Sequence, residues 1–133
     1  MTRPTIDQQI TFLYTRDLSK TADFYERVML MPLVLDQGTC RIYHVAGDAY
    51  LGFCERDETA DKPTGILCTL VTDEVDAWYT YLRSEGIPIE RMPTVNKVYG
   101  IYHFFALDPN GYVIEVQQFL DPAWHNLEAT TDF

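Results

Sequence analysis

The sequence has no long apolar run and few cationic residues, and each shortage excludes a class of protein. No hydrophobic stretch approaches the roughly 20 residues that a membrane-spanning helix needs. The polar N-terminus, residues 1–9, has no signal-peptide core, so we expect a cytoplasmic protein that does not enter a membrane. Ten Lys and Arg stand against 20 Asp and Glu, a net charge of -10. Without a basic face, we expect no nucleic-acid partner.

Cysteine is also scarce. Cys40, Cys54 and Cys68 are an odd set without CxxC spacing. A disulfide-stapled domain or a zinc knuckle needs a regular, usually even, pattern of cysteines. We therefore predict reduced, mostly buried thiols.

The composition that is present is that of a globular domain. The chain has 133 residues, of which 47% are hydrophobic and 23% charged. This length is enough to bury a core, and the balance excludes a disordered chain. We predict a single domain over residues 1–133.

The two halves of the chain repeat one order of elements: a strand, a helix and three strands. The predicted elements of the first half are strand 10–15, helix 18–30 and strands 33–36, 40–45 and 49–54. Those of the second half are strand 66–71, helix 74–85 and strands 87–90, 100–106 and 112–118. The same tripeptide, Ile-Tyr-His, begins at Ile42 and at Ile101, in the third strand of each half, which supports a duplication.

The repeat predicts an α+β fold of two tandem βαβββ modules. The modules are about 9–55 and about 66–119, with a polar linker at 56–65 and a tail at 120–133. We expect their sheets to pair edge to edge into a curved, cupped mixed sheet with the helices on the outer face. Asp17 and Asp73 are the predicted N-caps of the two helices, and Gly86 suits the end of the second.

Three segments carry a resemblance to a known family: Asp17-Leu18, Ala22–Tyr25 and above all Leu107–Glu115, which reads LDPNGYVIE. With them the chain resembles the glyoxalase / bleomycin-resistance / extradiol-dioxygenase superfamily, the vicinal oxygen chelate proteins, over residues 9–119. The resemblance implies the fold. It leaves the chemistry open, because the family includes lyases, isomerases, ring-cleaving oxygenases, thiol transferases and non-catalytic drug binders.

The resemblance also implies four metal-ligand positions, which here hold Ile10, Gly52, Ile66 and Glu115. Only Glu115 offers a ligand atom, and one carboxylate does not hold a divalent ion tightly. We therefore expect no metal cofactor. A displaced metal site that uses cysteine, Glu115 and a histidine remains an alternative.

The last hairpin predicts which side chains accompany Glu115. The turn Asp108–Gly111 fits a type I turn followed by a left-handed glycine, which pairs Asp108 with Tyr112. Phe105 then lies opposite Glu115, and His103 opposite Gln117, all on one face. Because histidine titrates near neutral pH, His103 and Glu115 are the predicted catalytic acid/base pair. Phe105 and Gln117 are predicted to bind ligand.

The hairpin of the first half favours Tyr43 over His44 as a ligand-binding residue. A two-residue loop at Gly47-Asp48 pairs Tyr43 with Gly52 and turns His44 to the other face. Three further ligand-binding residues are predicted: Gly52, Phe12 and, in the tail, Trp124. Arg91, Lys97 and Tyr99 are interpreted as a surface loop that could reach an anionic or aromatic ligand.

The missing metal ligands and the many aromatic residues predict a protein that binds a small, flat or aromatic molecule in the cup without a metal. The alternative is a lyase, isomerase or dioxygenase-type enzyme of the same superfamily that uses Glu115 and His103. A third alternative is a subunit whose cup another chain closes. From the resemblance we expect a homodimer.

Overall fold

The computed structural model describes residues 2–57 and 63–125, and the chain divides into two compact units, Met1–Asp61 and Lys62–Phe133. The boundary falls within the predicted linker 56–65, of which residues 58–62 lie outside the described residues, as do residues 126–133 of the predicted tail. No helix among the described residues is long and apolar enough to span a membrane.

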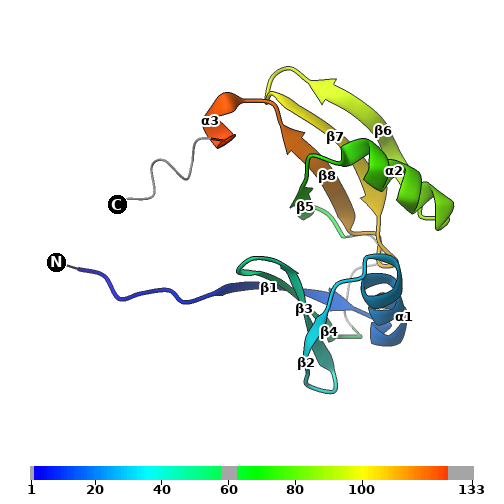
Figure 1. Cartoon of the computed structure of the whole chain (residues 1–133). Helices are drawn as coiled ribbons and strands as arrows, with labels where there is room; N and C mark the ends of the chain where they lie inside the picture. The colour runs from blue at the N-terminus through cyan, green and yellow to red at the C-terminus, as the bar shows by residue number, and fades with distance from the viewer. Residues whose placement is uncertain (1, 58–62, 126–133) are drawn as a thin grey trace. The chain divides into compact units, whose positions relative to one another are not determined.

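The first unit is a four-stranded mixed sheet with one helical segment against it (Figure 1). Its strands lie in the order β1-β4-β3-β2, with β1 and β4 parallel and the other pairs antiparallel. The elements are β1 (Gln9–Thr15), α1 (Leu18–Asp23), the π-helical turn η1 (Phe24–Val28), β2 (Leu33–Asp36), β3 (Cys40–Ala46) and β4 (Ala49–Glu55). Tyr25 of the helical segment packs on Tyr43 and Phe53, with ring centroids 6.0 Å and 4.5 Å away.

The second unit has the same topology, β5-β8-β7-β6, with β5 and β8 parallel. Its elements are β5 (Leu67–Val71), α2 (Val75–Ser84), β6 (Ile89–Asn96), β7 (Ile101–Leu107), β8 (Val113–Phe119) and the short α3 (Pro122–His125). The apolar side of α2 covers one face of the sheet, where Leu82, Phe104 and Val116 are fully buried. The opposite face carries the candidate site. The predicted α+β fold of two βαβββ modules is confirmed.

The turn residues explain where the helices begin and end. The carboxylate of Asp17 accepts a hydrogen bond from the Lys20 amide (3.0 Å), as predicted for an N-cap. The N-cap of α2 is Glu74, not the predicted Asp73, and its amide is held by the Thr72 hydroxyl (3.0 Å). Gly86 adopts a left-handed φ of 74° directly after Glu85, the C-cap of α2, as predicted.

The register of the first hairpin differs from the prediction by one residue. Gly47-Asp48 forms the turn, but a bulge at Val45 sets Ile42, not Tyr43, opposite Gly52. Because successive side chains alternate between faces, one added residue moves every side chain of β3 to the other face. Tyr43 is therefore fully buried under the helix, and its hydroxyl donates to Glu26 (2.9 Å). The predicted exposure of Tyr43 toward a ligand is wrong.

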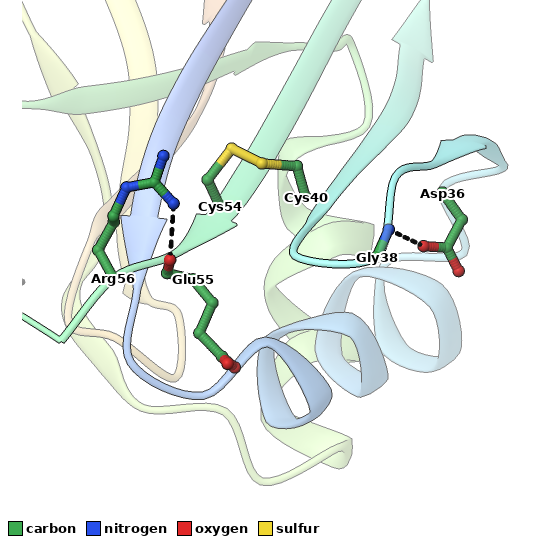
Figure 2. The surroundings of a disulfide bond; sticks show 6 residues. All are labelled: Asp36, Gly38, Cys40, Cys54, Glu55 and Arg56. Carbon is green, nitrogen blue, oxygen red and sulfur yellow. Dashed lines mark hydrogen bonds between the residues drawn. A yellow bond between two sulfur atoms is a disulfide. The ribbon is translucent and has the colours of Figure 1, made fainter.

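The same shift in the β3–β4 register places two of the cysteines opposite one another. Cys40 and Cys54 lie directly opposite one another on β3 and β4, with Cα atoms 4.1 Å apart, and form a disulfide. Figure 2 shows the bridge between the start of β3, beside the turn at Gly38, and the end of β4 at Glu55. The prediction of three reduced thiols is wrong for this pair, because the predicted register placed Cys40 opposite Glu55.

The third cysteine, Cys68, is a partly buried free thiol on β5. Burial raises its pKa to about 11, and the nearby Asp108 carboxylate contributes. Since the thiolate is the reactive form, we expect the native protein to show one thiol that reacts slowly at pH 8 and roughly 50- to 100-fold faster at pH 10. Titration with a chromogenic disulfide reagent measures this rate. Three fast thiols in native protein without reductant would contradict both the bridge and the burial.

Candidate functional site

The face of the second sheet opposite to α2 carries a row of side chains set by strand register. Across β5, β8, β7 and β6, the row is Thr69, Glu115, Phe105 and Arg91. In the next row, Gln117 lies opposite His103. The predicted register of this hairpin is confirmed: Asp108 pairs with Tyr112 through a 3.0 Å backbone bond, and Gly111 has a φ of 88°.

Glu115 is the centre of a hydrogen-bonded cluster, although only 5% of its surface is exposed. The Thr69 hydroxyl donates to one carboxylate oxygen (2.9 Å), and Nδ1 of His103 lies 2.6 Å from the other. In the orientation that satisfies its hydrogen bonds, the Gln117 amide donates to both oxygens, at 3.0 Å and 3.1 Å. Three donors stabilise the ionised carboxylate, as a buried charge requires.

In the part of the chain that the structure describes, the second ring nitrogen of His103 has no hydrogen-bond partner. The residue is 3% exposed, and Nε2 is a buried atom without a hydrogen bond among the described residues. With Glu115 ionised, Nδ1 carries the hydrogen, so Nε2 accepts in the neutral ring and donates in the charged ring. Buried polar atoms are almost always bonded, and an orphan of this kind calls for a functional explanation. A ligand with a polar atom that reached Nε2 would supply the hydrogen bond that this buried atom lacks.

A cavity of about 610 Å³ lies on the second unit. This volume is within the range of small-molecule pockets. Its lining includes Ile66, Leu67, Glu90, Arg91, Phe105 and Val113. Phe105 connects the cavity to the polar cluster, because its ring meets that of His103 edge to face with centroids 5.0 Å apart.

The remaining predicted ligand-binding residues lie elsewhere in the two units. Phe12 and Gly52 are neighbours on β1 and β4 of the first unit, and Phe12 is 44% exposed. Trp124 lies in α3, where its ring stacks on that of Phe119 with centroids 4.1 Å apart, so α3 packs against the end of β8. Tyr43 is in the core, as described above.

The Phe12 ring packs directly against the backbone of Gly52. A Cβ atom at Gly52 would lie 2.5 Å from two ring carbons of Phe12, so the ring must move aside. Since the ring is partly exposed, we expect Gly52→Ala to lower the free energy of unfolding by only about 1 kcal/mol. In a Phe12→Ala background the cost should vanish, and urea denaturation of the four variants measures the coupling. An equal cost in both backgrounds would contradict this packing.

The residues at the family's metal-ligand positions do not fit a divalent ion. In the first unit, the Phe12 ring covers the position at Gly52. In the second unit, three donors already hold the Glu115 carboxylate. Cys68 pairs with Ile114 and so lies on the face opposite to Glu115, while Cys54 is bonded to Cys40. Among residues 2–57 and 63–125, no group of three or more His, Cys, Asp or Glu is placed to bind a metal.

Sequence reasoning missed two contributors to the site. Thr69 lies beside Glu115 because β5 and β8 pair in parallel. No tight turn joins these two strands, so the sequence does not indicate their register. Arg91 was interpreted as part of a loop, but it lies on β6, which extends to Asn96. The sequence predicted a strand that ends at Glu90, but β6 is an edge strand and tolerates Pro93 within it.

Comparison with known proteins agrees with the fold. The family model for the Glyoxalase/Bleomycin resistance protein/Dioxygenase superfamily matches residues 7–116. No curated protein matches the sequence significantly.

Three solved structures illustrate the likeness. The bleomycin resistance determinant encoded on transposon Tn5 is 25% identical, with a TM-score of 0.71, and the match covers 86% of this chain and 98% of that one. Lactoylglutathione lyase from Agrobacterium tumefaciens is 26% identical (TM-score 0.69; 87% and 96% covered). A glyoxalase/bleomycin resistance protein/dioxygenase from Nocardioides is 21% identical (TM-score 0.73; 91% and 87% covered) and shows the fold alone.

Proposed function

Because the chain belongs to the glyoxalase/bleomycin resistance protein/dioxygenase superfamily, we propose that it binds a small planar molecule in its second unit without a divalent metal. The observation that carries this proposal is the buried, unpartnered Nε2 of His103. It lies beside an aromatic wall, Phe105, that also lines a cavity of about 610 Å³. One buried polar anchor next to an apolar surface is how proteins orient flat ligands.

The hydrogen bond between Glu115 and His103 suits ligand binding better than a purely structural role. Glu115 fixes the ring and tautomer of His103, so Nε2 points in one direction at little entropic cost when a ligand arrives. A ligand that hydrogen-bonds to Nε2 removes the cost of leaving that atom buried and unpaired. Among the similar structures is a bleomycin resistance determinant, which is the reason that antibiotics belong in a ligand screen.

A thermal-shift screen tests the proposal. Chelator-treated protein is mixed with a panel of planar aromatic compounds that includes antibiotics. We expect at least one compound to raise the melting temperature by several degrees, because a ligand present at about 100 times its Kd adds roughly 2.7 kcal/mol. No stabilisation by any member of a broad panel would reject the proposal.

The pair of His103 and Glu115 favours a second candidate, an enzyme that moves a proton. Nε2 of His103 would take a proton from the substrate as general base, and Glu115 would stabilise the imidazolium that forms. This role agrees with lyase or isomerase chemistry, and a lactoylglutathione lyase is among the similar structures. Any activity found should fall at least about 100-fold in Glu115→Gln and in His103→Gln. Unchanged turnover in both variants would reject this candidate.

We also propose that the chain forms a homodimer and resides in the cytoplasm. Light scattering on a sizing column measures the dimer directly. In a reducing cytoplasm the bond between Cys40 and Cys54 would open, since cellular thiols keep most cysteines reduced. Stability of the first unit would then differ between purified and cytoplasmic protein.

A further inference from the structure

We infer that the cavity of the second unit selects a planar aromatic monoanion, such as an aromatic carboxylate, with Arg91 as the residue that binds its charge. The inference rests on the proposed function and adds the chemical class of the ligand. It follows from three features of the cavity: its cation Arg91, its aromatic wall Phe105 and its acid Glu90.

The cation is Arg91, which lines the cavity from β6. Its guanidinium carbon lies 5.7 Å from the centroid of the Phe105 ring, directly across the strand pair. Within the described part of the chain it forms no salt bridge, whereas Arg27 pairs with Asp23 and Arg41 with Glu26. A guanidinium held over a ring keeps its planar fork of donors available, and that fork matches a carboxylate.

The excess of acidic residues in the chain makes an unpaired cation at the cavity significant. The chain has twice as many acids as Lys and Arg, with a net charge of -10. A surface of this kind repels anions in general. An unpaired arginine at the cavity therefore marks the place where an anionic group can be bound.

The aromatic wall fixes how a ligand would lie. The Phe105 ring contacts both the guanidinium of Arg91 and, edge to face, the ring of His103. A flat ring packed on Phe105 places its carboxylate toward Arg91 and leaves a second polar atom of the ligand free to reach Nε2 of His103.

Glu90 limits the charge that the cavity accepts. It lines the cavity beside Arg91, so a ligand with a second anionic group would meet a like charge. The cavity thus favours a monoanion over a dianion, and replacing Glu90 should relax that preference.

Paired probes test the inference. Calorimetry compares 2-naphthoate with 2-naphthamide, which has the same ring and no charge, and with 2,6-naphthalenedicarboxylate. Wild-type protein should bind the monocarboxylate roughly 5- to 50-fold more tightly than the amide. Arg91→Gln should abolish this preference. The matched variant Glu90→Gln should keep it and bind the dicarboxylate several-fold more tightly than wild type does.

The outcomes separate this inference from the proposed function. Amide and carboxylate bound equally by wild type, or a preference that survives Arg91→Gln, would overturn the anionic class and leave planar-ligand binding intact. Retained binding of the amide by Arg91→Gln shows that the variant is folded. Failure of every planar compound, charged or neutral, would overturn the proposed function and this inference with it.

Discussion

Replacing His103 with phenylalanine is expected to weaken ligand binding by roughly 10- to 100-fold, the largest functional effect that we predict. The reason is that Nε2 is the buried polar atom left for a ligand, while phenylalanine keeps the apolar volume of the ring. The measurement is a calorimetric titration with the tightest compound of the screen. Affinity within about twofold of wild type would contradict the role of His103.

The duplicated tripeptide supplies a matched control. His44 is the histidine of the same tripeptide in the first unit, where its Nε2 is already bonded to the Gly47 carbonyl (2.7 Å) and its ring packs on Tyr50. We expect His44→Phe to leave affinity unchanged within about twofold. Equal losses in both variants would point to a general effect on folding.

The His103 variant should also fold. Glu115 keeps the Thr69 hydroxyl and the Gln117 amide as donors after the imidazole is removed. The loss of one charge-assisted hydrogen bond should cost about 1–3 kcal/mol of unfolding free energy, partly offset by removal of the unpaired Nε2. Urea denaturation of the variant measures this difference and separates stability from affinity.

Removal of the disulfide has the largest expected effect on stability. Cys40→Ala with Cys54→Ala should lower the free energy of unfolding by about 3 kcal/mol, because the bridge closes a loop with a sequence separation of 14. It also anchors the end of β4, where the Glu55 carboxylate accepts a hydrogen bond from Leu18 at the start of α1 (3.0 Å). Loosening this strand end should therefore destabilise the helix as well.

The effect should be confined to the first unit. Both tryptophans, Trp78 and Trp124, are in the second unit, so their fluorescence reports its unfolding, while far-ultraviolet circular dichroism reports both. Hydrogen exchange should rise in β3 and β4 and stay constant in β7 and β8. Reductant should destabilise wild type by the same amount and leave the double variant unaffected. Wild-type stability that does not respond to reductant would contradict the prediction.

The two hairpins show how much of the site the sequence predicts. The register of the second hairpin is a property of its turn, since Asp108 and Gly111 select one turn type. For this reason the opposition of Phe105 and Glu115, and the contact between Glu115 and His103, were predicted correctly.

The first hairpin was predicted wrongly for a single physical reason. The bulge at Val45 adds one residue to β3 without a distinctive residue type to announce it. The added residue accounts for two errors, the burial of Tyr43 and the pairing of Cys40 with Cys54.

The sequence does not predict that Thr69 and Arg91 belong to the site, for another reason. Thr69 depends on the register of parallel strands that are joined through a helix and two further strands. Arg91 depends on irregular pairing of β6, which shifts register twice. Both relations are set by long-range packing, so no local pattern encodes them.

The central claim is that this chain binds its ligand through His103 and its neighbours without the metal of its family. The most direct test is to titrate the tightest planar compound into protein stripped by a chelator, before and after addition of excess Mn²⁺ or Zn²⁺, with elemental analysis of the untreated protein. We predict less than about 0.1 metal ion per chain and affinities that agree within about twofold across the three conditions. A stoichiometric metal whose removal abolishes binding and whose return restores it would contradict the account.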